Sequence, residues 1–152
     1  MGQYFRPVNT DKKEFVCPWC IKGGAKLWEW AANKQGSIFT LLLRKSDGSG
    51  GGDFFGYHKG YGEGSPVHEH GIVGRWAGDR VMLVGDYDTS EIYQAADGYR
   101  NVSEELVEAW NGFIELPEMQ LTFEKCGCHE PDLSPTEKVI RTVGTQMART
   151  VK

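Results

Sequence analysis

Four cysteines in two close pairs are the residues of this chain best suited to chemistry. Two residues separate Cys17 from Cys20 near the start, and one residue separates Cys126 from Cys128 near the end. Thiolates are preferred ligands of Zn²⁺, which binds four ligands tetrahedrally at structural sites. The pairs therefore predict one Zn²⁺ site, made by Cys17, Cys20, Cys126 and Cys128, that joins the two ends of a domain.

The first pair resembles the knuckle of zinc-ribbon proteins. A Cys-Pro-x-Cys turn, here followed by Gly23 and Gly24, brings two sulfurs to one ion and directs backbone N–H groups at them. The second pair departs from the ribbon pattern, because only Gly127 separates its cysteines and a whole domain lies between the pairs. His129 follows directly and is a reserve ligand.

Two other interpretations of the cysteines stay open. Cys17 and Cys20 would be a thioredoxin-like redox pair if they followed a buried parallel strand and opened a helix. The charged segment 11–14 and the glycines after Cys20 disfavour that context. In the second interpretation the cysteines are free or buried thiols that bind no metal, although buried cysteines have no reason to occur in pairs. Four protein ligands would leave no position for substrate water, so a zinc site here should be structural.

A second, catalytic metal site is the alternative source of function. His68 and His70 would share one face of an extended segment, and Asp86 lies downstream. Such groups serve metal-dependent hydrolases as ligands or general bases. Ordinary roles compete with this hypothesis, because Asp is common in turns and at helix starts. Asp79 in a turn and Asp88 at a helix start have such roles, whereas Asp86 has no obvious one. His58 and Glu63 in the glycine-rich segment are further candidates.

The glycine-rich segment 47–66 predicts a surface loop with aromatic side chains. Eight of its twenty residues are Gly, and Phe54, Phe55, Tyr57 and Tyr61 are interleaved with them. It contains neither a phosphate-binding loop motif nor a dinucleotide fingerprint in register. Nucleotide binding by that route is therefore disfavoured.

Charge and hydropathy limit the partners and the compartment. Residues 131–152 hold four of the 17 basic and two of the 21 acidic residues, which leaves 13 basic and 19 acidic residues in 1–130. An acidic body is a poor match for nucleic acid or an anionic membrane. No apolar stretch is long enough to span a bilayer, and the N-terminus has no signal-like apolar region. We therefore expect a cytoplasmic protein whose partner is another protein.

The predicted elements come from apolar periodicity and turn residues. Strands are expected near residues 4–5 and 15–16, at 38–43, at 120–124, and as a hairpin of 72–76 with 81–84. Helices are expected at 25–33, at about 90–96 opened by a capping box at 88–91, at 103–115, and after Pro135. Four tryptophans are expected in the core: Trp28, Trp30, Trp76 and Trp110.

These elements predict an α+β fold. A mostly antiparallel sheet would carry its helices on one face, and the four-cysteine zinc site would join the N- and C-terminal parts. Residues 1–130 would form a single zinc-stabilised domain, and 131–152 a linker with an amphipathic C-terminal helix. The loop 47–66 and that helix are the expected contact surfaces. The predicted function is a non-catalytic protein-binding or regulatory domain, with the hydrolase as the alternative.

The chain also resembles a family of uncharacterised prokaryotic and phage-associated proteins. The resemblance lies in the opening Met1-Gly2-Gln3-Tyr4-Phe5-Arg6, in Gly24-Ala25-Lys26-Leu27-Trp28-Glu29-Trp30, and in Trp76-Ala77-Gly78-Asp79-Arg80-Val81 with Gly85-Asp86-Tyr87. It covers patches of residues 1–115. It implies an intracellular single-domain protein and no particular activity.

Overall fold

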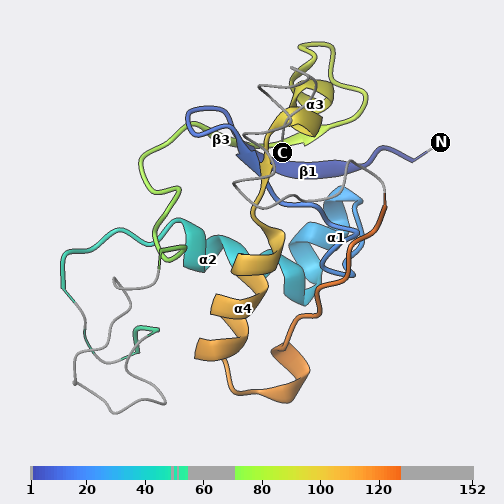
Figure 1. Cartoon of the computed structure of the whole chain (residues 1–152). Helices are drawn as coiled ribbons and strands as arrows, with labels where there is room; N and C mark the ends of the chain where they lie inside the picture. The colour runs from blue at the N-terminus through green and yellow to red at the C-terminus, as the bar shows by residue number, and fades with distance from the viewer. Residues whose placement is uncertain (1, 49, 51, 55–70, 128–152) are drawn as a thin grey trace, which may run out of the picture.

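A computed structural model describes residues 2–48, 50, 52–54 and 71–127 of the chain (Figure 1). Its strands are β1 Phe5–Asn9, β2 Glu14–Phe15, β3 Val81–Gly85 and β4 Arg100–Asn101. Its α-helices are α1 Leu27–Ala32, α2 Ile38–Leu42, α3 Ile92–Ala95 and α4 Ser103–Phe113. Short 3-10 helices cover Lys34–Ser37, Ala96–Gly98 and Pro117–Met119. The predicted α+β class is confirmed.

The four strands form one mixed sheet in the order β3-β1-β2-β4. Strand β1 pairs antiparallel with both β2 and β3, and β2 pairs parallel with β4. The prediction of a mostly antiparallel sheet is therefore wrong, because β4 enters the sheet from α3 and runs alongside β2. This parallel pairing places the start of α4 directly beside the end of β2, where the first cysteine pair begins.

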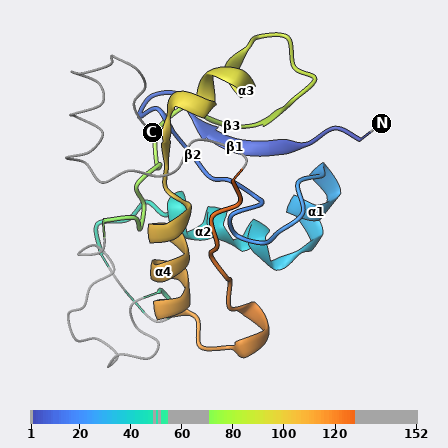
Figure 2. The same cartoon turned by 45° about the vertical axis from the view of Figure 1, so that its right-hand side comes forward.

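Helices cover both faces of the sheet rather than one. Figures 1 and 2 show α3 on one side of β1 and β3, and α1, α2 and α4 on the other. Strand residues alternate between two cores, with Val8 and Val84 facing α3 and Phe5 and Leu83 facing the opposite side. Cys17 and Cys20 belong to the smaller core on the α3 side.

Three of the predicted strand assignments are wrong. Residues 38–42 form the helix α2, in which Ile38, Leu41 and Leu42 are fully buried at helical spacing. The predicted hairpin does not form, because residues 71–79 are turns and β3 pairs with the distant β1. The segment 120–124 is also no strand, although its backbone reaches the cysteine site.

Other predicted elements are found where expected. The helices at 27–32, 92–95 and 103–113 and the strands β1 and β2 are confirmed. Asp88 does not cap α3, whose N-cap is Glu91 with a left-handed φ of 73°. Instead the Ser90 hydroxyl accepts the Ile92 N–H at 3.2 Å. The predicted C-terminal helix and most of the 47–66 loop lie outside the described residues.

The four tryptophans that were expected in the core divide into three buried residues and one surface residue. Trp30, Trp76 and Trp110 are buried, and each donates its indole N–H to an oxygen. Trp28 is 63% exposed, so its predicted place in the core is wrong. Among the described residues, none of the helices has both the length and the apolar character that crossing a bilayer requires.

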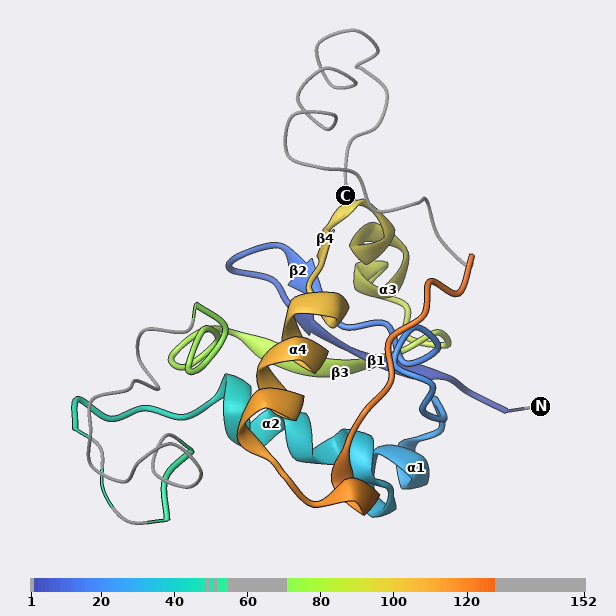
Figure 3. The ribbon, with the colours of Figure 1, turned by 60° about the horizontal axis from the view of Figure 1, so that its bottom comes forward.

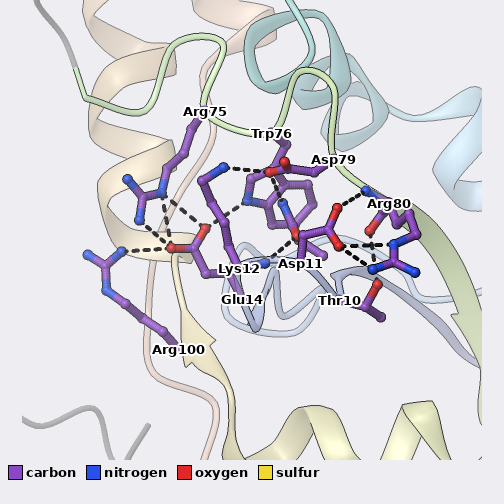
Figure 4. Close-up of polar contacts among 10 residues, drawn as sticks. Thr10, Asp11, Lys12, Glu14, Arg75, Trp76, Asp79, Arg80 and Arg100 are labelled. Carbon is purple, nitrogen blue, oxygen red and sulfur yellow. Dashed lines mark hydrogen bonds and ion pairs between the residues drawn. The ribbon is translucent and has the colours of Figure 1, made fainter.

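A buried carboxylate, Glu14, joins the β1–β2 hairpin to the segment that precedes β3 (Figure 4). Its side chain is 3% exposed and accepts hydrogen bonds from Arg75 and from the indole of Trp76 at 2.8 Å. The guanidinium of Arg100, on β4, lies 3.4 Å from the Glu14 carboxylate. Nearby, Asp79 binds Lys12 and Asn9, and these contacts hold three distant segments together.

We expect acid to weaken the contacts of Glu14 with Arg75 and Trp76. Burial alone would raise the pKa of Glu14, but the hydrogen bonds from Arg75 and Trp76 together outweigh it and hold the pKa below its ordinary 4.5. A lowered folded-state pKa means that the carboxylate stabilises the fold above about pH 4.5 and that this stability is lost as the pH falls through the folded value. Urea unfolding of the wild type and Glu14→Gln from pH 7 to pH 3 should give stability curves that converge at low pH. A constant difference across this range would contradict the assignment.

Candidate metal centre

Three cysteines from the two ends of the chain meet in the structure. The sulfurs of Cys17, Cys20 and Cys126 all lie within 4.8 Å of one another, and Cys17 Sγ is 3.6 Å from Cys126 Sγ. Sulfurs around a tetrahedral zinc with Zn–S bonds of about 2.3 Å are about 3.8 Å apart. A disulfide would bring two sulfurs to about 2.05 Å, and no disulfide joins these three cysteines. The cluster therefore has the spacing of a thiolate metal site.

The first pair sits on a tight turn immediately after β2. The Ile21 N–H donates to the Cys17 carbonyl at 3.3 Å, and the Gly23 N–H donates to the Pro18 carbonyl at 2.9 Å. These bonds wind the chain so that both sulfurs project to the same side. Cys17 and Cys20 are 1% and 0% exposed, so the turn presents its sulfurs inward.

The C-terminal segment is fixed against this turn by more than its sulfur. The Glu124 N–H donates to the Cys20 carbonyl at 2.8 Å, and the Glu124 carboxylate lies 2.7 Å from Lys22 Nζ. Figure 3 shows this orange segment running from the end of α4 back to the blue N-terminal part of the chain. Asn111 on α4 positions the start of this segment. Its side chain donates to the Leu121 carbonyl and accepts the Leu121 N–H, both at 2.8 Å.

Two polar side chains from the β4–α4 junction support the turn. The Cys17 N–H donates to Ser103 Oγ at 2.8 Å, and the Ser103 hydroxyl donates to Asn101 Oδ1 at 2.5 Å. The Asn101 amide nitrogen in turn lies 3.8 Å from Cys20 Sγ. The ring of contacts from Cys17 through Ser103 and Asn101 to Cys20 fixes both cysteines. Donors to a ligating sulfur are typical partners of metal sites.

The surroundings of Cys17 hold its thiol in the neutral form when no cation is near. The hydrogen bond with the Cys20 thiol, burial and the charge of Cys20 raise the pKa of Cys17 far above its ordinary value. The Cys126 sulfur adds to the same effect. Three thiolates so close together need a cation to balance their charge. Metal binding to this site must therefore release protons and weaken as the pH falls.

Asn101 should tune metal affinity without being a ligand. Asn101→Ala removes a donor to Cys20 Sγ and the acceptor that orients Ser103, so we expect a 10- to 100-fold loss of zinc affinity, as for other outer contacts of metal ligands. Competition with a chromophoric chelator measures this change. Asn9→Ala removes an amide contact to Asp79 elsewhere in the sheet and is the matched control. Equal zinc affinity in the two variants would contradict the role of Asn101.

The structure thus brings together three of the four predicted ligands. Cys128 and the reserve ligand His129 lie outside the described residues, as do His58, Glu63, His68 and His70. Asp86 has a structural partner, since its carboxylate accepts the Tyr4 backbone N–H at 3.0 Å. Hydrogen bonds from Lys12 and Asn9 lower the pKa of Asp79, and those from Ser90 lower the pKa of Asp88.

Sequence reasoning missed Asn101, Ser103 and Glu14. Asn101 and Ser103 flank the start of α4, a position where polar residues usually serve the helix itself. Their link to the cysteines arises only from the parallel pairing of β2 with β4. Glu14 lies in a charged segment typical of an exposed hairpin. Its burial becomes evident only from its contact with the buried Trp76, which is distant in sequence.

Comparisons of this chain with protein-family models, with curated proteins and with solved structures find no match.

Proposed function

We propose that this chain is a zinc-stabilised, non-catalytic protein-binding domain. The observation that carries the proposal is the convergence of Cys17, Cys20 and Cys126, from opposite ends of the chain, within 4.8 Å. In this proposal Cys128, two residues after Cys126, supplies the fourth ligand. Zn²⁺ fits this set because four thiolates in a tetrahedral arrangement are its usual structural shell.

The site has the properties of a structural rather than a catalytic centre. A shell closed by four thiolates has no position for substrate water. Redox chemistry is also disfavoured, since reactive thiols are partly exposed and have lowered pKa values, whereas Cys17 is buried and its pKa is raised. The metal would instead hold the C-terminal segment against the turn after β2.

A protein partner is supported by two large apolar side chains exposed on α1. Trp28 and Leu27, at the start of α1, are 63% and 51% exposed. We call Leu27 and Trp28 the α1 surface. Exposed tryptophans of this kind carry much of the binding energy at protein interfaces.

Metal analysis tests the first half of the proposal. Protein purified without added metal should contain one zinc per chain, and Cys126→Ser and Cys128→Ser should each reduce that content. His68→Ala with His70→Ala should leave it unchanged. Two metals per chain, with one lost in the histidine variant, would contradict a single structural site and favour the hydrolase.

Partner capture from the native host tests the second half. A protein that copurifies with the wild type should bind the purified chain directly, and Trp28→Ala should weaken that binding at least tenfold. Among the described residues, Trp28 does not pack on either core, so the variant should keep its zinc and its unfolding temperature. Glu118→Ala, on the 3-10 helix after α4, is the control. Equal binding by Trp28→Ala would exclude the α1 surface.

A further inference from the structure

Strand β3 forms an edge of the sheet in the part of the chain that the structure describes. The hydrogen bonds of β1 and β3 join residues with even numbers, from Tyr4 with Asp86 to Thr10 with Arg80. In a strand, neighbouring residues point their backbone groups in opposite directions. The N–H and C=O groups of Val81 and Leu83 therefore point away from β1, and no partner for them is found among the described residues.

Within the described residues, the strand itself carries few of the features that usually protect an edge, although the Asp88 N–H donates to the Gly85 carbonyl at its end. The sequence of β3, Val-Met-Leu-Val-Gly, contains no charge and no proline, and its register with β1 runs without a bulge. Met82 is 37% exposed beside it. A shallow groove of about 390 Å³ follows the strand and is lined by Met82, Val84, Tyr87 and Ile92 among others.

Charges at the two ends of β3 are placed symmetrically about its centre. Arg80 precedes the strand by one residue and Asp86 follows it by one, so both lie three residues from Leu83. Arg80 is 81% exposed, and its ion pair with Asp11 leaves guanidinium donors for another carboxylate. Both residues have even numbers and therefore share the face of the sheet on which Met82 and Val84 lie.

We propose that β3 pairs antiparallel with β3 of a second copy of this chain, with Leu83 opposite Leu83. The two Leu83 residues would exchange both backbone hydrogen bonds, and Val81 would lie opposite Gly85 of the second copy. Arg80 would then face Asp86 of the second copy, and Met82 would face Val84 of the second copy beside the groove. A two-fold axis repeats each contact, which gives four favourable cross-strand pairs on one face.

The charge pattern is what favours a second copy over an unrelated extended peptide. An antiparallel strand that placed a base opposite Asp86 and an acid opposite Arg80 would fit this edge, and β3 itself has that sequence. This inference goes beyond the proposed function, because it needs neither the metal nor the α1 surface.

Sedimentation equilibrium of the full chain as purified, from low to several hundred micromolar, tests the pairing. The wild type should dimerise, and Arg80→Glu should weaken the dimer roughly tenfold or more by placing two like-charged pairs opposite one another. Adding Asp86→Lys to Arg80→Glu should restore the dimer. Lys34→Glu makes the same charge change on the 3-10 helix after α1 and should have no effect.

Amide exchange provides a second measurement that needs no variant. The Val81 and Leu83 amides should be protected in the dimer and should lose that protection on dilution. A wild type that stays monomeric throughout would overturn the proposal and leave the edge to a different partner. A dimer that Arg80→Glu does not weaken, or that the double variant does not restore, would also overturn it.

Discussion

Cys17→Ser is expected to leave the chain unfolded at neutral pH. Structural zinc contributes about 10–16 kcal/mol of apparent free energy in small metal-dependent domains, whereas whole domains are stable by only about 5–15 kcal/mol. Cys17 Sγ lies 3.6 Å from Cys126 Sγ, so the substitution removes both a proposed ligand and the link between the chain ends, while the Cys17 N–H bond to Ser103 is kept. Circular dichroism and zinc content of the purified variant measure the result.

The control for this experiment is a neighbouring core residue that binds no metal. Ile21→Val shortens a side chain that is 2% exposed and should cost only about 0.5–1.5 kcal/mol, with one zinc retained. A chelator should unfold the wild type and Ile21→Val alike. A Cys17→Ser protein that is zinc-free and well folded would contradict the structural role of the metal.

Glu14→Ala is expected to be strongly destabilising, although it removes no apolar side chain from the core. It leaves the Trp76 indole and the partly buried Arg75 without their acceptor, and breaking a buried ion pair in this way costs about 3–5 kcal/mol. Arg75 is 30% exposed, which favours the lower end of that range. For a chain of this size the unfolding temperature should fall by roughly 6–12 °C.

Asp11→Ala provides the comparison, because its carboxylate also joins the β1–β2 hairpin to the segment before β3 (Figure 4). It accepts hydrogen bonds from the Arg80 side chain at 2.9 Å and from the Arg80 N–H at 2.8 Å, but that arginine is 81% exposed, and exposed ion pairs add little to stability. The unfolding temperature of Asp11→Ala should therefore stay close to that of the wild type. Equal destabilisation by the two variants would mean that burial of Glu14 adds nothing.

Local periodicity was enough to predict most helices but not every apolar segment. Residues 38–42 are too short and too apolar for periodicity alone to separate a strand from a buried helix. The spacing of Ile38, Leu41 and Leu42, three and four residues apart, was the signal that favoured a helix. The pairing of β1 with β3 joins residues about 75 positions apart in sequence, and no local pattern specifies such a partner.

Some residues of the candidate site could be predicted from the sequence and others could not. The types and spacing of Cys17, Cys20 and Cys126 predicted that they would meet, because thiolate pairs have few other uses in one chain. Asn101 and Ser103 could not be predicted, since their roles depend on the parallel pairing of β4 with β2. Polar residues that support a ligand carry no sequence signature of their own.

X-ray absorption at the zinc edge of the protein as purified tests the proposed metal site most directly. We predict one zinc per chain with four sulfur neighbours at about 2.3 Å and no nitrogen or oxygen ligand. Cys128→Ser should reduce the sulfur count by one in any protein that retains metal. A metal shell of nitrogen and oxygen ligands, or a folded protein that contains no zinc, would contradict this prediction.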